Sequence, residues 1–281
     1  MAYPRPFALS ALAWIVALFI EVAASLSVSS TVLILARDEA SAPSAYSGLR
    51  GYGIPYQVVT VPSTGTTLPT LNSSIITGNY GAIVVLSEVS YQYPTGFFSA
   101  LTTAQWQQLY DYQTAFGVRM VRLDVYPGAE FGRCTYSSSV HLSAHAWVGT
   151  TTAIAGAGCC DAGVEQLISI TNTTGFPTAG LNIGAGVTAR GLWHYPATIT
   201  DSSIAWEIAQ FAPAGLFSSV TTAAVINKIG SRQQMVWFTS WATEWSASSN
   251  FLQHAWIHWV TRALCRFHPQ QKSDQPILMY M

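Results

Sequence analysis

Short apolar runs separated by polar turns recur through the first half of the chain. Thr31–Ala36 and Tyr80–Leu86 are nearly continuous apolar runs, and Gln57–Val61, closed by Pro62, is a shorter one. Val118–Val125 is a further strand candidate, in which Arg119, Arg122 and Asp124 stand among apolar residues. Continuous apolar runs of this length predict strands that are buried on both faces, as in a parallel sheet.

Helical patterns lie between these runs. The stretch from Ala104 to Phe116 has an apolar side, Thr102 or Thr103 as its cap and Gly117 as its stop signal. A shorter helix is expected over Tyr46–Tyr52. Strand and helix therefore alternate along this part of the chain, which is typical of α/β proteins with a mostly parallel sheet.

The expected fold class is α/β, with a Rossmann-like sheet similar in architecture to glutamine-amidotransferase-like domains. That activity is not expected, because it needs a cysteine nucleophile in a tight turn after a strand. Ser87-Glu88-Val89 follows Leu86 instead. Likeness of fold alone does not establish function.

The end of the chain predicts two strands and a helix. Ala223–Ile229 and Met235–Phe238 are apolar runs joined through a tight turn at Gly230-Ser231. A helix follows, with Ser248 or Ser249 as its N-cap. Its apolar stripe has helical spacing and consists of Leu252, Ala255, Trp256, Trp259, Val260 and Ala263.

Between these parts, helical periodicity fades and short β-type runs alternate with Gly, Ser and Thr. We interpret residues 128–219 as a β-rich, sandwich-like insertion into an α/β domain of residues 31–127 plus 220–262. One run, Ala205–Phe211, fits a strand or a short helix. The other β-type runs are Val140–Val148, Val164–Ile170 and Ala197–Thr200.

The first residues predict export. Arg5 precedes the apolar stretch Phe7–Ile20, and Val22-Ala23-Ala24 offers a small-residue cleavage site, so residues 1–24 are interpreted as a signal peptide. The alternative is a membrane anchor. The apolar stretch is shorter than the roughly 20 residues that a span needs, and Glu21 interrupts it.

Composition and cysteines agree with a secreted protein. Charged residues make up only 9% of the 281 residues, the net charge is −1, and there is no basic stripe, so nucleic acid is not an expected partner. An exported chain is free to form disulfides, and we expect Cys134 to pair with Cys159 or Cys160, leaving Cys265 in the tail. Asn72 and Asn172 begin glycosylation sequons.

Several motifs have residue spacings that occur in known ligand or metal sites. Gly184-Ala185-Gly186 with Ala189 matches a degenerate dinucleotide-binding pattern, but no helix begins there, so a glycine-rich turn is expected. Two histidine pairs have metal-ligand spacing without an adjacent carboxylate, and neither is expected to bind metal. These pairs are His254 with His258 and His141 with His145.

Carboxylates gather where predicted strands end. Arg37-Asp38-Glu39, Glu88 and Asp124 all follow apolar runs, and ligand sites of open α/β sheets occur at such ends. Asp38, Glu88 and Asp124 suggest a hydrolase as one hypothesis. The favoured interpretation is a set of loop caps and one ion pair with Arg122 or Arg119.

Aromatic residues of the β-rich segment are the stronger binding candidates. Sugar rings stack their C–H faces on flat aromatic rings, and a cationic amine adds a cation–π attraction. The alternative for any single tryptophan is a place in the core. The candidates are Trp147, Trp193, Tyr195, Trp206 and Phe211, with Asp161, Glu165, Asp201 and Glu207 as acidic neighbours.

Long strings of this chain resemble the N-terminal region of the fungal secreted galactosaminogalactan deacetylases. The resemblance runs from about Thr31 to Arg262 and stops before residues 263–281, which form an atypical tail. The strings include VWFTSWATEWSASSNFLQHAWIHWVTR, GLRGYGIPYQVVTVP, NYGAIVVLSEVSY, VRMVRLDVYPGAEFG and GLWHYPATITDSSIAWEIAQFAP.

The resemblance implies a non-catalytic region with a carbohydrate-binding module that precedes a metal-dependent deacetylase domain. The expected partner is an extracellular, galactosamine-containing polysaccharide, whose free amines Asp201 and Glu207 would pair with. No cofactor, catalytic residue or metal site is expected in this chain, and no membrane partner after signal cleavage. The expected location is extracellular or at the cell wall. The alternative is a fragment of an intact deacetylase.

Overall fold

The computed structural model describes residues 25–128, 165–174, 181–214, 217–243 and 245–261. Three helices are described: α2 (Pro43–Gly51), α3 (Thr103–Phe116) and α4 (Ala247–Thr261). Nine of the described strands form one sheet in the order β11-β10-β12-β13-β14-β9-β6-β2-β3. In chain order these are β2 (Val32–Ala36), β3 (Tyr56–Thr60), β6 (Ala82–Leu86), β9 (Arg119–Leu123), β10 (Leu167–Ile170), β11 (Gly186–Thr188), β12 (Ala205–Phe211), β13 (Thr221–Ile229) and β14 (Arg232–Trp237).

One half of this sheet is parallel and the other is antiparallel. β14, β9, β6, β2 and β3 pair in parallel, whereas β13 pairs antiparallel with both β14 and β12. The predicted hairpin between β13 and β14 is confirmed, and Gly230 in its turn has φ +62°, which favours glycine. The likeness to Rossmann and amidotransferase folds stays a prediction.

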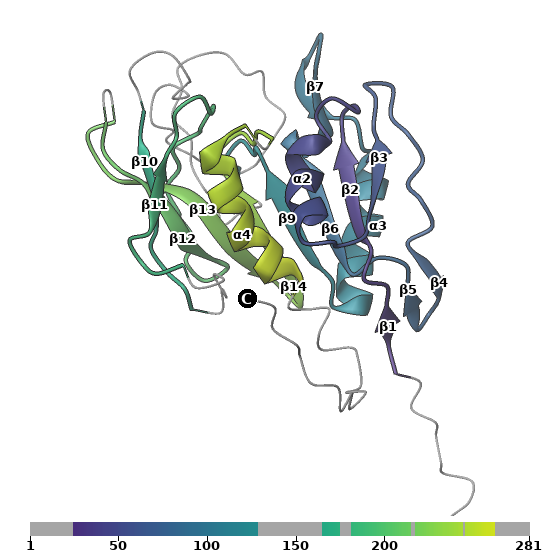
Figure 1. Ribbon diagram of the computed structural model, residues 1–281. Helices are drawn as coiled ribbons and strands as arrows, with labels where there is room; N and C mark the ends of the chain where they lie inside the picture. The colour runs from purple at the N-terminus through teal and green to yellow at the C-terminus, as the bar shows by residue number, and fades with distance from the viewer. Residues whose placement is uncertain (1–24, 129–164, 175–180, 215–216, 244, 262–281) are drawn as a thin grey trace, which may run out of the picture.

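The helices cover both faces of the sheet (Figure 1). α2 and α4 lie on one face, where Val32 and Ile34 of β2 pack in one core with Trp256 of α4. α3 lies on the other face, where Leu33 and Leu35 pack in a second core with Phe116. Neighbouring β2 side chains thus enter different cores, which explains why the strand is apolar at every position.

Local signals end the helices largely as expected. Thr102 and Gln105 form a capping box at the start of α3, and Gly117 ends it in the left-handed conformation. The predicted N-cap of α4, Ser248 or Ser249, was wrong by two or three residues. The Ser246 hydroxyl accepts the bond from the Ser249 N–H at 3.2 Å, while Ser248 lies inside the helix.

The described strands of the middle segment do not form a sheet of their own. β12 pairs with β13 from Ala205↔Asn227 to Phe211↔Thr221, so β10, β11 and β12 extend the sheet of the α/β part. β13 pairs through one edge with β14 and through the other with β12. Ala205–Phe211 is a strand, which settles that alternative. The division into domains stays a prediction.

Among the described strands, two smaller sheets are separate from the nine-stranded sheet. β1 (Ser27–Val28), β4 (Asn72–Ser74) and β5 (Thr77–Gly78) form a three-stranded sheet. β7 (Ser90–Tyr93) and β8 (Gly96–Ser99) form a hairpin that projects at the top of Figure 1. Within the described part of the chain, no helix has the length and apolar character to cross a membrane.

The strand order places a switch point at the centre of the parallel half. From β2 the chain proceeds to β3 on one side and then to β6 and β9 on the other. In open α/β sheets ligands bind outside the carboxyl ends of strands near such a point. The ends of β2, β6 and β9 are therefore where a ligand site is expected.

Candidate functional site

The backbone is strained where β6 and β9 end. Ser87, Glu88 and Val89 form a single turn after β6 with φ values of +48°, +55° and +44°, and Asp124 after β9 has φ +59°. Residues with side chains seldom adopt this left-handed region, and each costs about 1–3 kcal/mol. Such strain persists only where the surrounding structure holds it.

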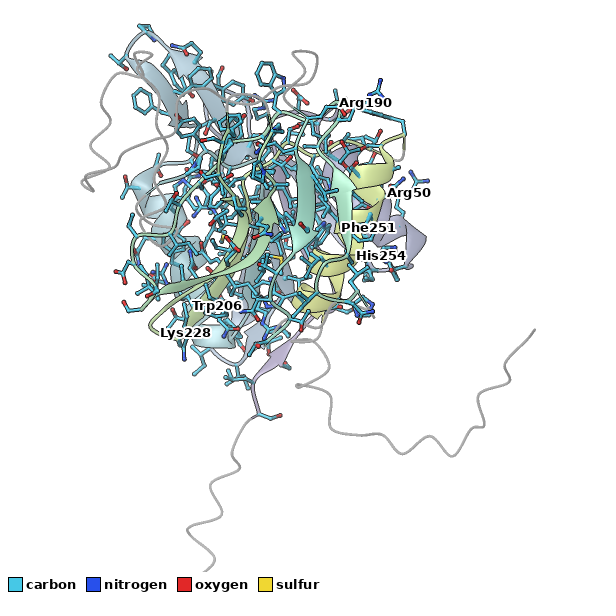
Figure 2. The ribbon with its side chains drawn as sticks, turned by 90° about the vertical axis from the view of Figure 1, so that its left-hand side faces the viewer. Arg50, Arg190, Trp206, Lys228, Phe251 and His254 are labelled. Atoms are coloured by element: carbon cyan, nitrogen blue, oxygen red, sulfur yellow. The ribbon has the colours of Figure 1, made fainter. Side chains whose placement is uncertain are left out.

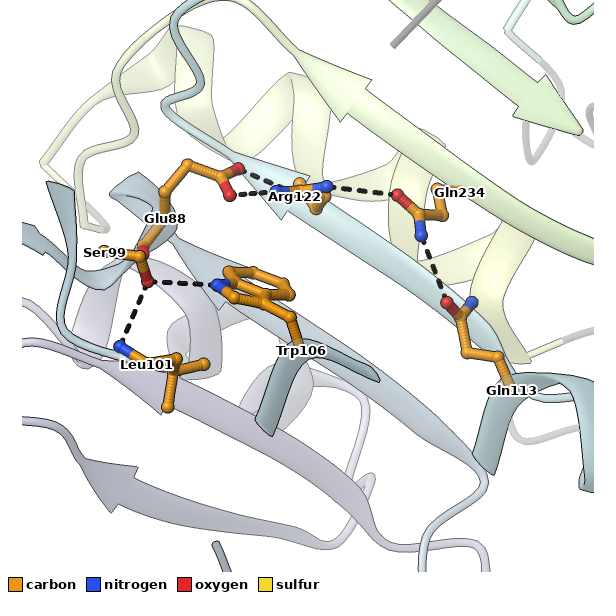
Figure 3. A network of polar contacts seen from close by, with 7 residues as sticks. All are labelled: Glu88, Ser99, Leu101, Trp106, Gln113, Arg122 and Gln234. Carbon is orange, nitrogen blue, oxygen red and sulfur yellow. Dashed lines mark hydrogen bonds and ion pairs between the residues drawn. The ribbon is translucent and has the colours of Figure 1, made fainter. Parts of the chain in front are cut away.

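A buried ion pair holds the turn. Arg122, with a side chain only 2% exposed, donates from Nε to Glu88 Oε1 at 2.8 Å and makes a second, closer contact to Oε2. Its guanidinium also reaches Gln234 Oε1 at 3.3 Å, and Gln234 donates to Gln113 Oε1 at 3.2 Å (Figure 3). The Arg122 guanidinium also lies over the Trp106 ring, with Cζ 4.6 Å from the ring centroid. The expected ion pair with Arg122 is confirmed.

A second set of bonds ties the same turn to α3. The Ser99 hydroxyl donates to the Glu88 carbonyl at 2.7 Å and accepts from Trp106 Nε1 at 3.2 Å (Figure 3). The Leu101 N–H also donates to that hydroxyl at 3.2 Å. Both ends of Glu88, side chain and carbonyl, are therefore fixed.

The turn brings Ser87 against Asp124. The Ser87 hydroxyl donates to Asp124 Oδ2. Burial raises the pKa of the Asp124 carboxyl, whereas the bond from Ser87, the nearby Arg37 charge and the Tyr195 hydroxyl lower it. Among described residues the other oxygen, Oδ1, has no hydrogen-bond partner of normal geometry. The carboxyl is thus shared between two segments and poorly solvated.

The segment Trp193–Tyr195 runs beside the end of β14. The Tyr195 N–H donates to the Phe238 carbonyl at 2.8 Å, and the Trp193 carbonyl accepts from the Ser240 N–H at 2.6 Å. Side chains alternate along such an extended segment. His194 is buried, while Trp193 and Tyr195 point the other way and Trp193 is 52% exposed.

Asp124, at the end of β9, is also bonded to the segment that follows β14. Its N–H donates to the Thr239 carbonyl at 3.0 Å, and Thr239 also bridges to His194 in antiparallel fashion. Tyr126, two residues after Asp124, has its ring 5.4 Å from the ring of Tyr195. Side chains from two distant segments therefore meet at one edge of the sheet.

Trp245 completes an aromatic surface. Its side chain is 70% exposed, and its ring lies 4.0 Å from the point where a Cβ on Gly191 would stand. Gly191 has φ +73° and lies two residues before Trp193. We call Tyr126, Trp193, Tyr195 and Trp245 the edge aromatic group. Trp193, Trp245 and Tyr126 are exposed, whereas Tyr195 is half-buried and packs against a small core cluster. Exposed aromatic side chains near one another mark interaction sites.

Residues 28–259 match the Agd3 CBM87 family model, which describes a carbohydrate-binding module. The chain belongs to this family. The crystal structure of Agd3, described as a novel carbohydrate deacetylase, matches with 55% identity and a TM-score of 0.74 over 84% of this chain. The match covers 33% of the Agd3 chain, so this chain spans about a third of its length.

Other comparisons add the fold alone. A cold-adapted β-galactosidase from Rahnella sp. R3 matches with a TM-score of 0.51 and 9% identity, over 89% of this chain and 33% of that chain. A search of curated proteins gave no match. The sequence resemblance to the deacetylase family is therefore confirmed at the level of the module.

The aromatic residues that the sequence suggested as binding candidates lie in different parts of the structure. Trp193 and Tyr195 belong to the edge aromatic group, but Trp206 of β12 packs partly buried against the main core, and Phe211 is fully buried. Figure 2 shows Trp206 and Lys228 at the opposite end of the sheet from Arg190. Trp147 lies outside the described residues.

The acidic candidates are held by local partners. The Asp201 carboxylate accepts from the Ser203 N–H at 3.0 Å, and Glu207 accepts from the Thr222 hydroxyl at 2.7 Å. Glu165 pairs with Arg190 at 3.3 Å. Asp161 lies outside the described residues. The pairing of Asp201 and Glu207 with sugar amines stays a prediction.

The hydrolase hypothesis loses support from the geometry. Asp38 accepts from the Ser41 N–H at 2.7 Å, which lowers its pKa, and Glu88 is bound to Arg122. Two of its three carboxylates therefore act as a loop cap and an ion-pair partner. This is the arrangement that the favoured interpretation predicted.

Other motifs have structural places. Gly184 lies in a turn with φ +88°, and strand β11 follows it, so the pattern is a glycine-rich turn. The Nδ1 atom of His254 bonds the Tyr52 hydroxyl. The described residues include no group of three or more potential metal ligands. His141, His145 and the four cysteines, Cys134, Cys159, Cys160 and Cys265, lie outside the described residues.

Sequence reasoning missed the strained turn, Tyr126 and Trp245. The only signals were a tryptophan within a Thr/Ser-rich turn and a tyrosine directly after a buried strand. Neither pattern shows which tryptophans stay exposed, because exposure depends on segments far away in the chain.

Proposed function

We propose that this chain is a secreted carbohydrate-binding module that holds an extracellular, galactosamine-containing polysaccharide on its edge aromatic group. The observation that carries the proposal is the exposure of Trp193 and Trp245 at one edge of the sheet. The chain belongs to a family of carbohydrate-binding modules. Export and fungal origin are part of the proposal and rest on the predicted signal peptide and the resemblance.

The chemistry of the surface suits a sugar polymer. Flat rings accept the C–H faces of pyranose units, and successive rings can contact successive units along a chain. A free amine would add cation–π attraction to the same rings. Edge carboxylates outnumber cations here, because Arg122 is neutralised by Glu88 while Arg37 faces Asp38 and Asp124. The edge thus favours a neutral or cationic ligand over an anionic one.

Removing either exposed ring is expected to weaken retention on the polymer. We expect Trp193→Ala and Trp245→Ala each to weaken binding to galactosaminogalactan about fivefold to tenfold, because a stacked ring contributes about 1 kcal/mol or more. Pull-down of the purified chain on the insoluble polymer, with chitin and cellulose in parallel, measures this.

Tyr52→Ala is the matched control. Tyr52 is 46% exposed at the end of α2, away from the edge aromatic group, and its loss is expected to leave retention unchanged. Equal retention of all variants would show that these rings do not hold the polymer. Retention on none of the polymers by the folded wild type would overturn the proposed function.

Glycosylation distinguishes the two sequons. Asn72 is exposed on β4, where its Nδ2 donates to the Ser74 carbonyl at 3.0 Å, whereas Asn172 is partly buried and its Oδ1 accepts the Thr174 N–H at 2.8 Å. We therefore expect Asn72 to carry a glycan in a secreting eukaryotic host, seen as a mass decrease after enzymatic deglycosylation. Asn72→Gln is expected to abolish that decrease at this site, and an unmodified Asn72 peptide would contradict the prediction.

The alternative is that the module works beside a deacetylase domain in one longer protein. Agd3 favours this, since it contains a matching region within a chain about three times as long. An in-frame deacetylase domain encoded downstream of Arg262 would support the alternative. Binding by the edge aromatic group is expected in either case.

A further inference from the structure

An exposed ion pair lies beside the edge aromatic group. Arg190 Nε is 3.3 Å from Glu165 Oε1, and the two side chains are 77% and 48% exposed. The Arg122–Glu88 pair is different, because it is largely buried and held by further contacts. The charges of an exposed pair stay hydrated and gain little from one another. Glu165 is therefore a carboxylate whose partner is readily replaced.

The register of the sheet sets the two residues opposite each other. β10 pairs antiparallel with β11, and just beyond this ladder the Ala189 N–H donates to the Gln166 carbonyl at 2.7 Å. Glu165 and Arg190 are the next residues on these two segments. The place of the Glu165 carboxylate thus follows from backbone pairing, and it does not depend on the arginine.

A β-turn connects Arg190 to the exposed rings. The Leu192 N–H donates to the Ala189 carbonyl at 2.9 Å and closes the turn. Arg190 and Gly191 are its corner residues, and Gly191 has φ +73°, which favours glycine. Trp245 lies against this corner, since its ring is 4.0 Å from the point where a Cβ on Gly191 would stand.

The segment before α4 is tied to the same place. The Ser248 hydroxyl, three residues after Trp245, donates to the Thr188 carbonyl at 2.7 Å. The Thr188 hydroxyl accepts from the Arg190 N–H at 3.1 Å. Trp193 follows Arg190 by three residues and is 52% exposed. Hydrogen bonds thus hold an exposed ion pair and two exposed tryptophans in one region.

We propose that Glu165 binds the protonated amine of a deacetylated galactosamine unit that stacks on the edge aromatic group, and that Arg190 is the cation which this amine displaces. The inference rests on the proposed function and adds the residue that distinguishes free-amine sugars from N-acetylated ones. An ammonium group donates several hydrogen bonds and supplies the positive charge that Arg190 supplies in the free protein. An N-acetyl group has no charge, so it gains nothing from displacing the arginine.

Calorimetric titration with two galactosamine oligosaccharides of equal length tests the inference. One is fully N-acetylated, and the other has free amines, which are protonated in a slightly acidic buffer. We expect Glu165→Gln to weaken binding of the amine form about twofold to fivefold, the range of an exposed charge pair, and to leave the acetylated form unchanged. Arg190→Met is expected to strengthen binding of the amine form by a similar factor, because it frees the carboxylate. Concentrated salt should reduce both effects.

Two charge-matched variants are the controls. Lys228→Met removes an exposed cation at the opposite end of the sheet from Arg190 (Figure 2), and Asp111→Asn removes an exposed carboxylate on α3. They change the net charge as the two test variants do, but neither is expected to change the ratio of the two affinities. Equal shifts of this ratio in controls and test variants would show a general charge effect and overturn the inference.

The remaining outcomes separate the inference from the proposed function. An unchanged affinity ratio in both test variants, with the wild type binding, would overturn the inference and leave the proposed function intact. The same holds if Glu165→Gln weakens binding of both oligosaccharides equally, or if Arg190→Met weakens binding of the amine form. If the folded wild type binds neither oligosaccharide, the proposed function fails together with the inference.

Discussion

Replacing Arg122 by methionine is expected to lower the free energy of unfolding by about 3–5 kcal/mol, the usual effect of removing one partner from a buried ion pair. Arg122 is 2% exposed and Glu88 18% exposed, so Glu88 would keep a poorly hydrated charge without its partner. The left-handed turn would also lose its anchor. Chemical denaturation of Arg122→Met against the wild type measures the difference.

Two further variants make this result specific. Glu88→Gln in the Arg122→Met background removes the stranded charge and is expected to recover part of the loss. Arg232→Met removes a partly exposed arginine that stacks on the Tyr110 ring at 4.2 Å and is expected to cost no more than about 1 kcal/mol. A loss below 1 kcal/mol for Arg122→Met would mean that the turn is held by Ser99 and α3 alone.

Truncating Trp256 is expected to destabilise the fold to a similar extent. Its side chain is fully buried between α4 and the sheet, in one core with Ile34 and Met235. Trp→Ala substitutions in cores cost about 3–5 kcal/mol, because the lost contacts leave a cavity. The midpoint of thermal unfolding for Trp256→Ala, compared with the wild type, gives the measurement.

Trp245→Ala is the matched control, since the same substitution at a 70% exposed site is expected to change stability by less than about 0.5 kcal/mol. Trp256→Phe is expected to cost less than Trp256→Ala. It keeps most of the ring volume and removes an indole N–H that has no hydrogen-bond partner among the described residues. Equal effects at both tryptophans would contradict the packing described.

The strained backbone at the ends of β6 and β9 lies beside an exposed surface, which fits a binding role. Ser87, Glu88, Val89 and Asp124 violate local backbone preference within a sheet whose other elements follow it. Natural proteins tolerate such conflicts chiefly at functional sites. Tyr126 of the edge aromatic group is only two residues from Asp124, one of these strained residues.

The amino-acid sequence by itself determined the local elements of this protein. β2 and β6 follow from continuous apolar runs, α3 from its Thr102 cap and Gly117 stop, and the stripe of α4 from helical spacing. It also indicated that Glu88 and Asp124 follow strand ends, because a carboxylate directly after an apolar run is a local pattern. Periods and caps act within a few residues, so a single sequence contains them.

Only the tertiary structure decided how those elements combine into a site. The sequence indicated a separate β-rich unit, but pairing of β12 with β13 makes the strands of that segment part of one sheet. The left-handed turn after β6 exists because Arg122 and Ser99 hold it, and no glycine marks it. Trp256 is buried and Trp245 exposed although both are tryptophans in one short stretch. Burial and backbone strain depend on partners that are distant in the chain, and a local pattern does not specify them.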